Sequence, residues 1–280
     1  MRRYLLLISA CLILVACQQE TVQEASVYTL YLPIIMTAPG PVKGVAGGSC
    51  EDVAAVGGRW RYGWMPQIND CPNIEDVPMI GNTKAMGQPV GGDSAWLMGF
   101  NEPDWKEQAN IPPKEAAIMW RQIEALYPTR LLVAPAPSCA RGGEQWLVNF
   151  YNEYRKLYGR PPRLDALAVH CYNGLGDTTE CKELVRWYLR QAQTWGVAEV
   201  WVTEFGFQAW RSDGDFAWGP GLAAMDDFIQ FLNEQPGVTR YAWFTARMRG
   251  DEWWSWGPDA TTALFDDGGL TPFGKQYRGY

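Results

Sequence analysis

The stretch LMGFNEPD, from Leu97 to Asp104, ends an apolar run on an acid, Glu102, and follows that acid with a proline. An unpaired carboxylate at the edge of a core is costly, because it loses hydration without gaining a partner. Active sites of (β/α)8 barrels lie at the carboxyl ends of the barrel strands. A barrel strand that ends at Glu102 would therefore place this acid where chemistry occurs.

Apolar, β-rich runs like this one recur along the chain. Several are continuous rather than alternating, which is typical of parallel strands buried on both faces. We expect strands at residues 42–47, 59–64, 77–82, 95–101, 130–136, 164–172, 199–206 and 240–246.

Helical patterns separate the later strands. The clearest is PPKEAAIMWRQIEALYP, which begins with prolines and is closed by Pro128. We expect helices at residues 113–127, 144–157, 181–195 and 221–233. Eight strands with intervening helices predict an α/β fold of the (β/α)8 TIM barrel type. The spacers after the first two strands are short, so we expect a compact barrel with some reduced helices.

The first twenty residues have the layout of a secretory signal, with Arg2 and Arg3, an apolar run and then Cys17. The apolar run is too short to span a membrane. Its end, LVAC, resembles a bacterial lipobox, which implies cleavage before Cys17 and acylation of its thiol; cleavage at a nearby small residue is the alternative. We expect a signal peptide at 1–16, a lipidated tether at 17–41 and one folded domain at 42–280. The expected location is the bacterial cell envelope, with the outer membrane or cell surface favoured because Gln18, not an aspartate, follows Cys17.

The composition favours a neutral ligand. The formal charge is −7, and removal of Arg2 and Arg3 makes it −7 − 2 = −9, which argues against nucleic acid or an anionic membrane surface as a partner. Aromatic residues make up 14% of the chain and include 15 tryptophans, more than a core of this size needs. Some of these rings are expected to line a surface, as in sugar-binding proteins.

Five cysteines lie beyond the expected signal and the acylated Cys17, and in an exported protein they can oxidise. An odd number leaves at least one free or paired between chains, and the connectivity is not readable from the sequence alone. Disulfides that staple neighbouring loops would join Cys50 to Cys71 and Cys171 to Cys181. No metal site is expected, because no CxxC spacing is present and His170 is the only histidine.

A second acid, Glu204, ends the run VWVTEFGF as Glu102 ends its own strand. The two acids are 204 − 102 = 102 residues apart, but the fourth and seventh strands of a closed barrel face each other. Two carboxylates that flank one bond are the machinery of glycoside hydrolysis. The structural alternatives are a helix-start acid for Glu102 and a buried pair with Arg247 for Glu204.

Three motifs carry a resemblance to a known family. GFNEPD at 99–104, AVHCY at 168–172 and VWVTEFGF at 200–207 resemble the Asl1-like catalytic domain, glycoside hydrolase family 128, and the resemblance extends over residues 42–280. It implies a TIM barrel that cleaves β-1,3-glucan with retention. Glu102 would be the acid/base, Glu204 the nucleophile, and Asn101, whose alternative role is to cap a turn, would contact the sugar 2-hydroxyl. One departure is Gly63, where the family pattern leads us to expect an asparagine.

Other side chains are expected near this pair. His170 and Tyr172 share a face of one strand by its period of two. His170 is either a core histidine or a hydrogen-bond partner of sugar or of the two glutamates, and Tyr172 would hold Glu204 in its ionised form. Candidate platforms for sugar rings, each of which can instead be packing, are Trp64, Trp243, Trp105, Trp210 and the run at 251–259.

The sequence therefore predicts a retaining, endo-acting β-1,3-glucanase without a cofactor. Its partner would be a polysaccharide or oligosaccharide and not nucleic acid, it would touch the membrane only through its lipid anchor, and it would be a monomer. The alternatives are another retaining β-glycanase that cleaves β-1,4-linked glucan or mannan, and a surface lipoprotein that binds glycan without cutting it.

Overall fold

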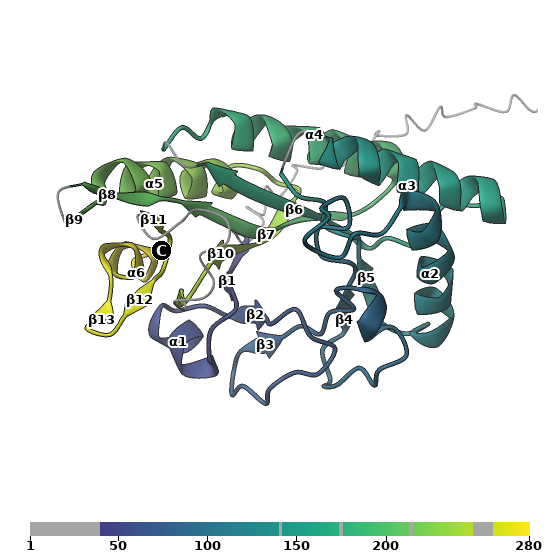
Figure 1. Cartoon of the computed structure of the whole chain (residues 1–280), viewed down its shortest axis with the longest axis horizontal. Coiled ribbons are helices and arrows are strands. Elements are labelled where there is room, and N and C mark those ends of the chain that lie inside the picture. The colour runs from purple at the N-terminus through teal and green to yellow at the C-terminus, as the bar shows by residue number, and fades with distance from the viewer. Residues whose placement is uncertain (1–39, 140–141, 174–175, 213–214, 249–259) are drawn as a thin grey trace, which may run out of the picture. The chain divides into compact units, whose positions relative to one another are not determined.

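Eight parallel strands form the central sheet of the computed structural model, which describes residues 40–139, 142–173, 176–212, 215–248 and 260–280. Their order across the sheet is β3-β2-β1-β10-β7-β6-β5-β4. The strands are β1 (Val42–Ala46), β2 (Trp60–Tyr62), β3 (Glu75–Asp76), β4 (Trp96–Met98), β5 (Leu131–Val133), β6 (Ala166–Asn173), β7 (Glu199–Phe207) and β10 (Val238–Phe244). Figure 1 shows this sheet curling, so that β4 and β5 approach β2 and β3. The α/β fold with parallel strands is thus confirmed.

The two outermost strands of the sheet are linked through the chain that comes after β3. Met79 forms a parallel bridge with Met98 of β4. Backbone hydrogen bonds run from Met98 N to Pro78 O (2.9 Å), from Ile80 N to Met98 O (3.0 Å) and from Asn101 N to Gly81 O (2.8 Å). The strand expected at 77–82 is placed wrongly, because the regular strand is Glu75–Asp76. Regular pairing does not continue through Pro78, since proline has no N–H to donate to a neighbouring strand.

Four long helices confirm the periodic patterns of the sequence: α2 (Pro113–Leu126), α3 (Gly143–Tyr158), α4 (Thr179–Trp195) and α5 (Gly219–Asn233). They lie outside the sheet (Figure 1), where α4 packs on β6 and β7 and α2 packs on α3. The remaining helices are short, namely α1 (Cys50–Ala55), the 3-10 helix η1 (Thr83–Ala85) and α6 (Pro272–Tyr277). The first half of the sheet therefore carries reduced helices, as expected.

Apolar residues pack on both faces of the sheet. The larger cluster fills the space between strands and helices. A second cluster on the other face includes Trp201, whose ring contacts those of Trp60 and Trp96. Gly44 is required beside them, because a Cβ there would lie 2.4 Å from the indole nitrogen of Trp60. The rings surround the guanidinium of Arg240, which is 4.3 Å from the centroid of Trp201.

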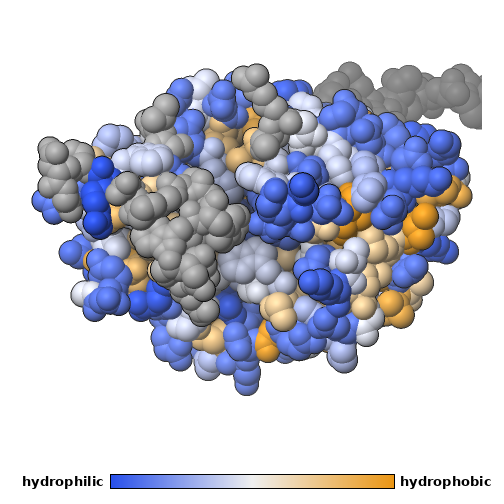
Figure 2. All heavy atoms as spheres, viewed as in Figure 1, coloured by the Kyte–Doolittle hydropathy of each residue, from blue (hydrophilic) through white to orange (hydrophobic). Residues whose placement is uncertain are grey.

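Two small antiparallel sheets come after the strand that carries Glu204. One contains β8 (Ala209–Ser212), β9 (Asp215–Ala217) and β11 (Ala260–Thr261), and the other contains β12 (Phe265–Asp266) and β13 (Gly269–Leu270). On the face drawn in Figure 2, hydrophilic residues prevail, and apolar residues gather toward the end of the molecule where α2 lies.

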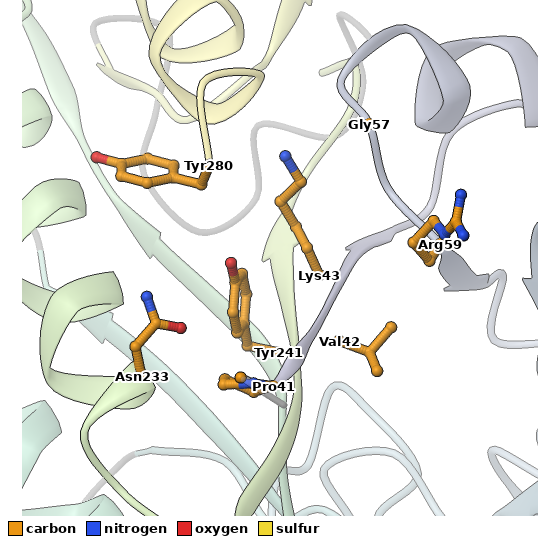
Figure 3. Close-up of a pocket in the computed structure, with 9 residues that line it drawn as sticks. Pro41, Val42, Lys43, Gly57, Arg59, Asn233, Tyr241 and Tyr280 are labelled. Carbon is orange, nitrogen blue, oxygen red and sulfur yellow. The ribbon is translucent and has the colours of Figure 1, made fainter. Parts of the chain in front are cut away.

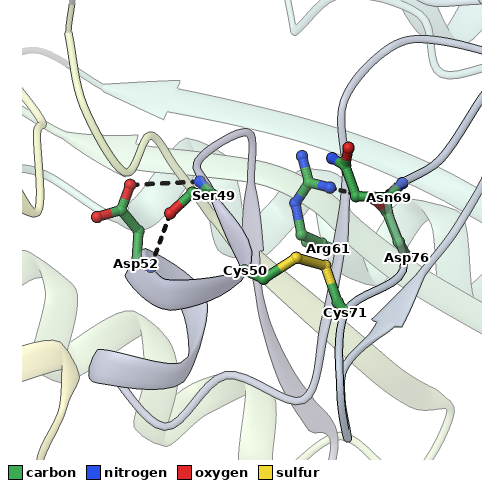
Figure 4. Close-up of a disulfide and its surroundings, with 7 residues drawn as sticks. All are labelled: Ser49, Cys50, Asp52, Arg61, Asn69, Cys71 and Asp76. Carbon is green, nitrogen blue, oxygen red and sulfur yellow. Dashed lines mark hydrogen bonds and ion pairs between the residues drawn. A yellow bond between two sulfur atoms is a disulfide. The ribbon is translucent and has the colours of Figure 1, made fainter.

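Both expected disulfides are present, Cys50–Cys71 and Cys171–Cys181. The first ties the start of α1 to the chain before β3, next to the Ser49–Asp52 capping box (Figure 4). Cys139 is a free thiol, and burial raises its pKa to about 11, so it is protonated at neutral pH.

The expected signal peptide, Cys17 and almost all of the tether lie outside the described residues, as does the tryptophan-rich run at 251–259. Within the described part of the chain, no helix combines the length and the apolar character that a membrane span requires.

Candidate active site

Glu102 lies just after β4 in an unusual backbone conformation. Its φ is +42°, in the left-handed region that few residues other than glycine adopt. Its N–H donates to Ala136 O (2.8 Å), and Asn101 forms a bridge with the same alanine, so the chain beyond β5 holds this turn in place. Such conformations cluster at functional sites, where surrounding contacts impose them. The Glu102 side chain is almost fully buried.

Glu204 lies within β7, in register with His170 of β6. Three side chains in the described part of the chain donate hydrogen bonds to it. The Tyr62 hydroxyl and the Trp64 indole N–H reach Oε1 at 2.6 and 2.9 Å, and the Tyr172 hydroxyl reaches Oε2. The three donors converge on this carboxylate and fix its orientation. Tyr172 thus contacts Glu204, together with Tyr62 and Trp64, and its role in keeping Glu204 ionised stays a prediction.

The imidazole of His170 lies between the two glutamates. Its Nδ1 is 3.0 Å from Oε1 of Glu102, and its Nε2 is 3.5 Å from Oε1 of Glu204. Burial lowers the pKa of His170, but the negative charges of Glu204 and Glu102 outweigh burial and raise that pKa above its ordinary value. The histidine thus carries positive charge more readily between two carboxylates than it would alone.

The two tyrosines beside Glu204 remain protonated at neutral pH. Burial and the charge of Glu204 raise the pKa of the Tyr62 hydroxyl and that of Tyr172 well above the ordinary tyrosine value. Both hydroxyls therefore act as donors throughout the physiological range.

Glu102, His170 and Glu204 also form a group that could hold a metal ion, since one ligand atom from each lies within 4.8 Å of the others. The arrangement fits a bridge made of a hydrogen bond to Glu102 and an ion pair with Glu204 better than a metal site. His170 directs a different ring nitrogen at each glutamate, whereas a metal ion binds an imidazole through one nitrogen only.

The tryptophans expected as sugar platforms divide into three cases. Trp64 reaches the site, with its indole N–H on Glu204. Trp105 and Trp210 are 40% and 41% exposed, so their rings are accessible, and their contact with sugar stays a prediction. The prediction for Trp243 is wrong. Its neighbour Ala242 lies in the cluster with Trp60, and the alternation of the strand sends Trp243 to the opposite face. There the ring is fully buried against Phe273 and donates to Thr262 O (2.7 Å).

Asn101 is half-buried next to Glu102. Its Nδ2 is 3.4 Å from Gln108 Oε1, while its buried Oδ1 has no hydrogen-bond partner among the described residues. The sugar contact expected of it stays a prediction. Arg247, the alternative partner of Glu204, instead pairs with Asp52 (2.8 Å).

Sequence reasoning missed Tyr62, although the run Arg59–Trp64 was recognised as a strand. The available signal was the period of two, which places Trp60, Tyr62 and Trp64 on the same face. Because Tyr62 lies on this face near the carboxyl end of the strand, the pattern indicates a side chain that can reach Glu204.

Two buried carboxylates that meet beside the carboxyl ends of parallel strands form the arrangement that a glycosidase uses. Residues 49–277 match the family described as glycosyl hydrolase catalytic core, and the chain belongs to this family. Its assignment to glycoside hydrolase family 128, expected from three motifs, is confirmed by the solved structures that it resembles.

Three of these structures are representative. A subgroup III curdlan-specific exo-β-1,3-glucanase from Blastomyces gilchristii, in complex with glucose, shares 25% identity at a TM-score of 0.69, over 85% of this chain and 98% of that one. A subgroup II endo-β-1,3-glucanase from Pseudomonas viridiflava shares 28% identity at 0.62, over 85% and 96%. A subgroup I endo-β-1,3-glucanase from Amycolatopsis mediterranei, in complex with laminaritriose, shares 25% identity at 0.65, over 86% and 99%. No curated protein sequence matches the chain significantly.

Proposed function

We propose that this glycosidase is a retaining endo-β-1,3-glucanase. The linkage is supported by the three similar solved structures, all β-1,3-glucanases, of which two are endo-acting. The retaining mechanism is supported by the close approach of Glu102 and Glu204.

The observation that carries the mechanism is the separation of the two acids. An oxygen of Glu102 and an oxygen of Glu204 lie within 4.8 Å of each other. Retaining glycosidases hold their carboxyl groups roughly 5–5.5 Å apart, whereas inverting enzymes need about 6.5–9.5 Å to admit a water molecule. The approach of these two oxygens is compatible with a retaining pair, in which one carboxylate attacks directly.

In this proposal Glu204 is the nucleophile. Its three donors among the described residues orient it, so that one oxygen attacks the anomeric carbon while Glu102 protonates the departing glycosidic oxygen. Glu102, now ionised, then takes a proton from water, which attacks the anomeric carbon and releases Glu204. His170, in contact with both acids, orients Glu102 through Nδ1.

We also propose that the sheet is a closed (β/α)8 barrel, which the bridge between Met79 and Met98 supports. Closure brings the carboxyl ends of all eight strands to one rim, where the acids meet.

The anchoring of the protein is a separate proposal. The lipobox-like LVAC supports a lipoprotein of the bacterial cell envelope, tethered through Cys17 with the outer membrane or cell surface favoured, and we propose that this lipoprotein is a monomer. Cys17→Ala should release the protein from the membrane fraction; a variant that stays membrane-bound would contradict lipidation.

The test of the activity is hydrolysis of laminarin, curdlan and β-1,4-linked glucan and mannan, with product sizes recorded and the first-formed anomer read by proton NMR. Laminarin should give several oligosaccharide sizes early, as β-anomers. Products of the α configuration would exclude a retaining mechanism. Glucose as the sole early product would exclude endo action, and faster hydrolysis of β-1,4-linked substrates would exclude β-1,3 specificity.

Two variants test the roles of the acids. Glu204→Gln should lose at least about a thousandfold in kcat while still binding laminarin. Glu102→Ala should lose activity that azide restores, because azide needs no general base to attack the glycosyl-enzyme. Full activity in Glu204→Gln would remove the nucleophile assignment, and laminarin binding without hydrolysis by the unaltered protein would indicate a non-catalytic glycan-binding protein.

A further inference from the structure

A second pocket lies at the opposite ends of the strands from the glutamates. Its volume is about 500 Å³, within the range of small-molecule sites. It begins at Gly40–Lys43 at the start of β1 and at Arg59 before β2, whereas Tyr62 at the other end of β2 touches Glu204. The two sites are therefore separated by the length of a strand.

Lys43 and Arg59 give this pocket positive charge. Among the described residues no Asp or Glu side chain lines this pocket, and the other lining residues include Asn233, Tyr241 and Tyr280. Figure 3 shows Asn233 and Tyr241 on one side of Lys43, with Arg59 on the other. The Tyr280 hydroxyl is already directed at Asp226 (2.9 Å), so Asn233 and Tyr241 are the uncharged polar groups available to a ligand.

Lys43 is a buried cation without a carboxylate partner. Only 9% of the residue is exposed, and its ammonium donates to the backbone oxygen of Tyr277 (3.0 Å). In the described part of the chain neither Lys43 nor Arg59 forms an ion pair. The ammonium also lies 5.2 Å from the centroid of the Tyr277 ring, which compensates part of its charge. An anion in this pocket would supply the ion pair that Lys43 lacks among the described residues.

We propose that this pocket binds a phosphate monoester of a small polyhydroxylated compound. Two cations match the double negative charge of a monoester, whereas a carboxylate would compensate only one of them. The guanidinium of Arg59 fits phosphate oxygens in pairs, and the ammonium of Lys43 acts as a point charge. The volume exceeds that needed for phosphate alone and leaves Tyr241 and Asn233 to contact the hydroxylated part.

Isothermal titration calorimetry tests the proposal with glucose 6-phosphate, glucose and inorganic phosphate as probes. Glucose 6-phosphate should bind, and glucose should not. Arg59→Gln should weaken binding at least about tenfold, because a charge-assisted hydrogen bond is lost. Lys84→Gln, a change of an exposed lysine on η1, should leave it unchanged. Arg59 is exposed, so Arg59→Gln should fold normally. Lys43→Met should also weaken binding of glucose 6-phosphate. Thermal unfolding checks that both variants are folded.

A second experiment distinguishes a lipid headgroup from a soluble phosphate ester as the ligand. It measures sedimentation of the protein with vesicles that contain phosphatidic acid, a lipid phosphate monoester. Sedimentation that depends on Arg59 would assign the site to a lipid headgroup, and binding of glucose 6-phosphate alone would assign it to a soluble ester. The proposal is overturned if no probe binds, if glucose or inorganic phosphate binds as tightly as the ester, or if Arg59→Gln binds normally. Laminarin hydrolysis should be unchanged in every variant, so failure here is distinct from failure of the proposed glucanase activity.

Discussion

His170 Nδ1 lies 3.0 Å from Oε1 of Glu102, and the His170 side chain is completely buried. The pKa of this histidine is raised in the folded protein, whereas in the unfolded chain it is about 6.5. A raised pKa stabilises the fold fully below the unfolded value, and this contribution is lost as the pH rises through the folded value.

The pH dependence of stability should therefore change in His170→Gln. From about pH 6.5 upward, the free energy of unfolding of the unaltered protein should fall relative to that of the variant, by at most about 1.4 kcal/mol per pH unit. Urea denaturation of both proteins across this interval measures the difference. Parallel pH profiles would show that His170 does not titrate as proposed.

Tyr62→Phe should lower kcat with little effect on KM, because it removes one donor from Glu204 without altering the surface offered to sugar. A hydrogen bond to a charged group contributes about 1.5–3 kcal/mol, which corresponds to roughly a 10- to 150-fold decrease.

The matched control is Tyr154→Phe, which removes a buried hydroxyl that donates to Glu124 at the same distance, 2.6 Å. This control should lower the free energy of unfolding and leave kcat unchanged. Equal kcat values for the two variants would assign Tyr62 a purely structural role.

Trp105→Ala and Trp210→Ala should each raise KM for long laminarin oligosaccharides, since both rings are exposed and a sugar face packs on an aromatic ring. A loss of about 1 kcal/mol corresponds to roughly a fivefold increase. Leu126→Ala, a change of an exposed apolar residue on α2, should have no effect. Unchanged KM for both tryptophan variants on every chain length would exclude them as platforms.

Removal of either disulfide by paired serine substitutions should destabilise the protein, by about 3 kcal/mol for Cys50–Cys71 with its sequence separation of 21. Loss of Cys171–Cys181 should lower kcat as well, because Cys171 lies between His170 and Tyr172. The first double variant serves as the control for the second in thermal unfolding and laminarin assays. Equal kcat in both variants would contradict this coupling.

The long helices were predictable because their periodic patterns extend over many residues, as in α2 and α4. The strand after Cys71 was placed wrongly, because a two-residue strand before a proline has almost no pattern of its own. Trp243 was misassigned for a different reason. Strands that are apolar on both faces do not show which face meets the site, whereas His170 and Tyr172 were correctly expected to share one.

The bonds between residues 78–81 and 98–101 also affect how the protein behaves when crowded. Two unpaired edge strands would offer free N–H and C=O groups to other chains, which promotes aggregation. In this protein, backbone groups of residues 78–81 and 98–101 hydrogen-bond with each other instead. Proline substitutions around Met98 should therefore lower the solubility of the protein at high concentration, in addition to any effect on catalysis through the neighbouring Glu102.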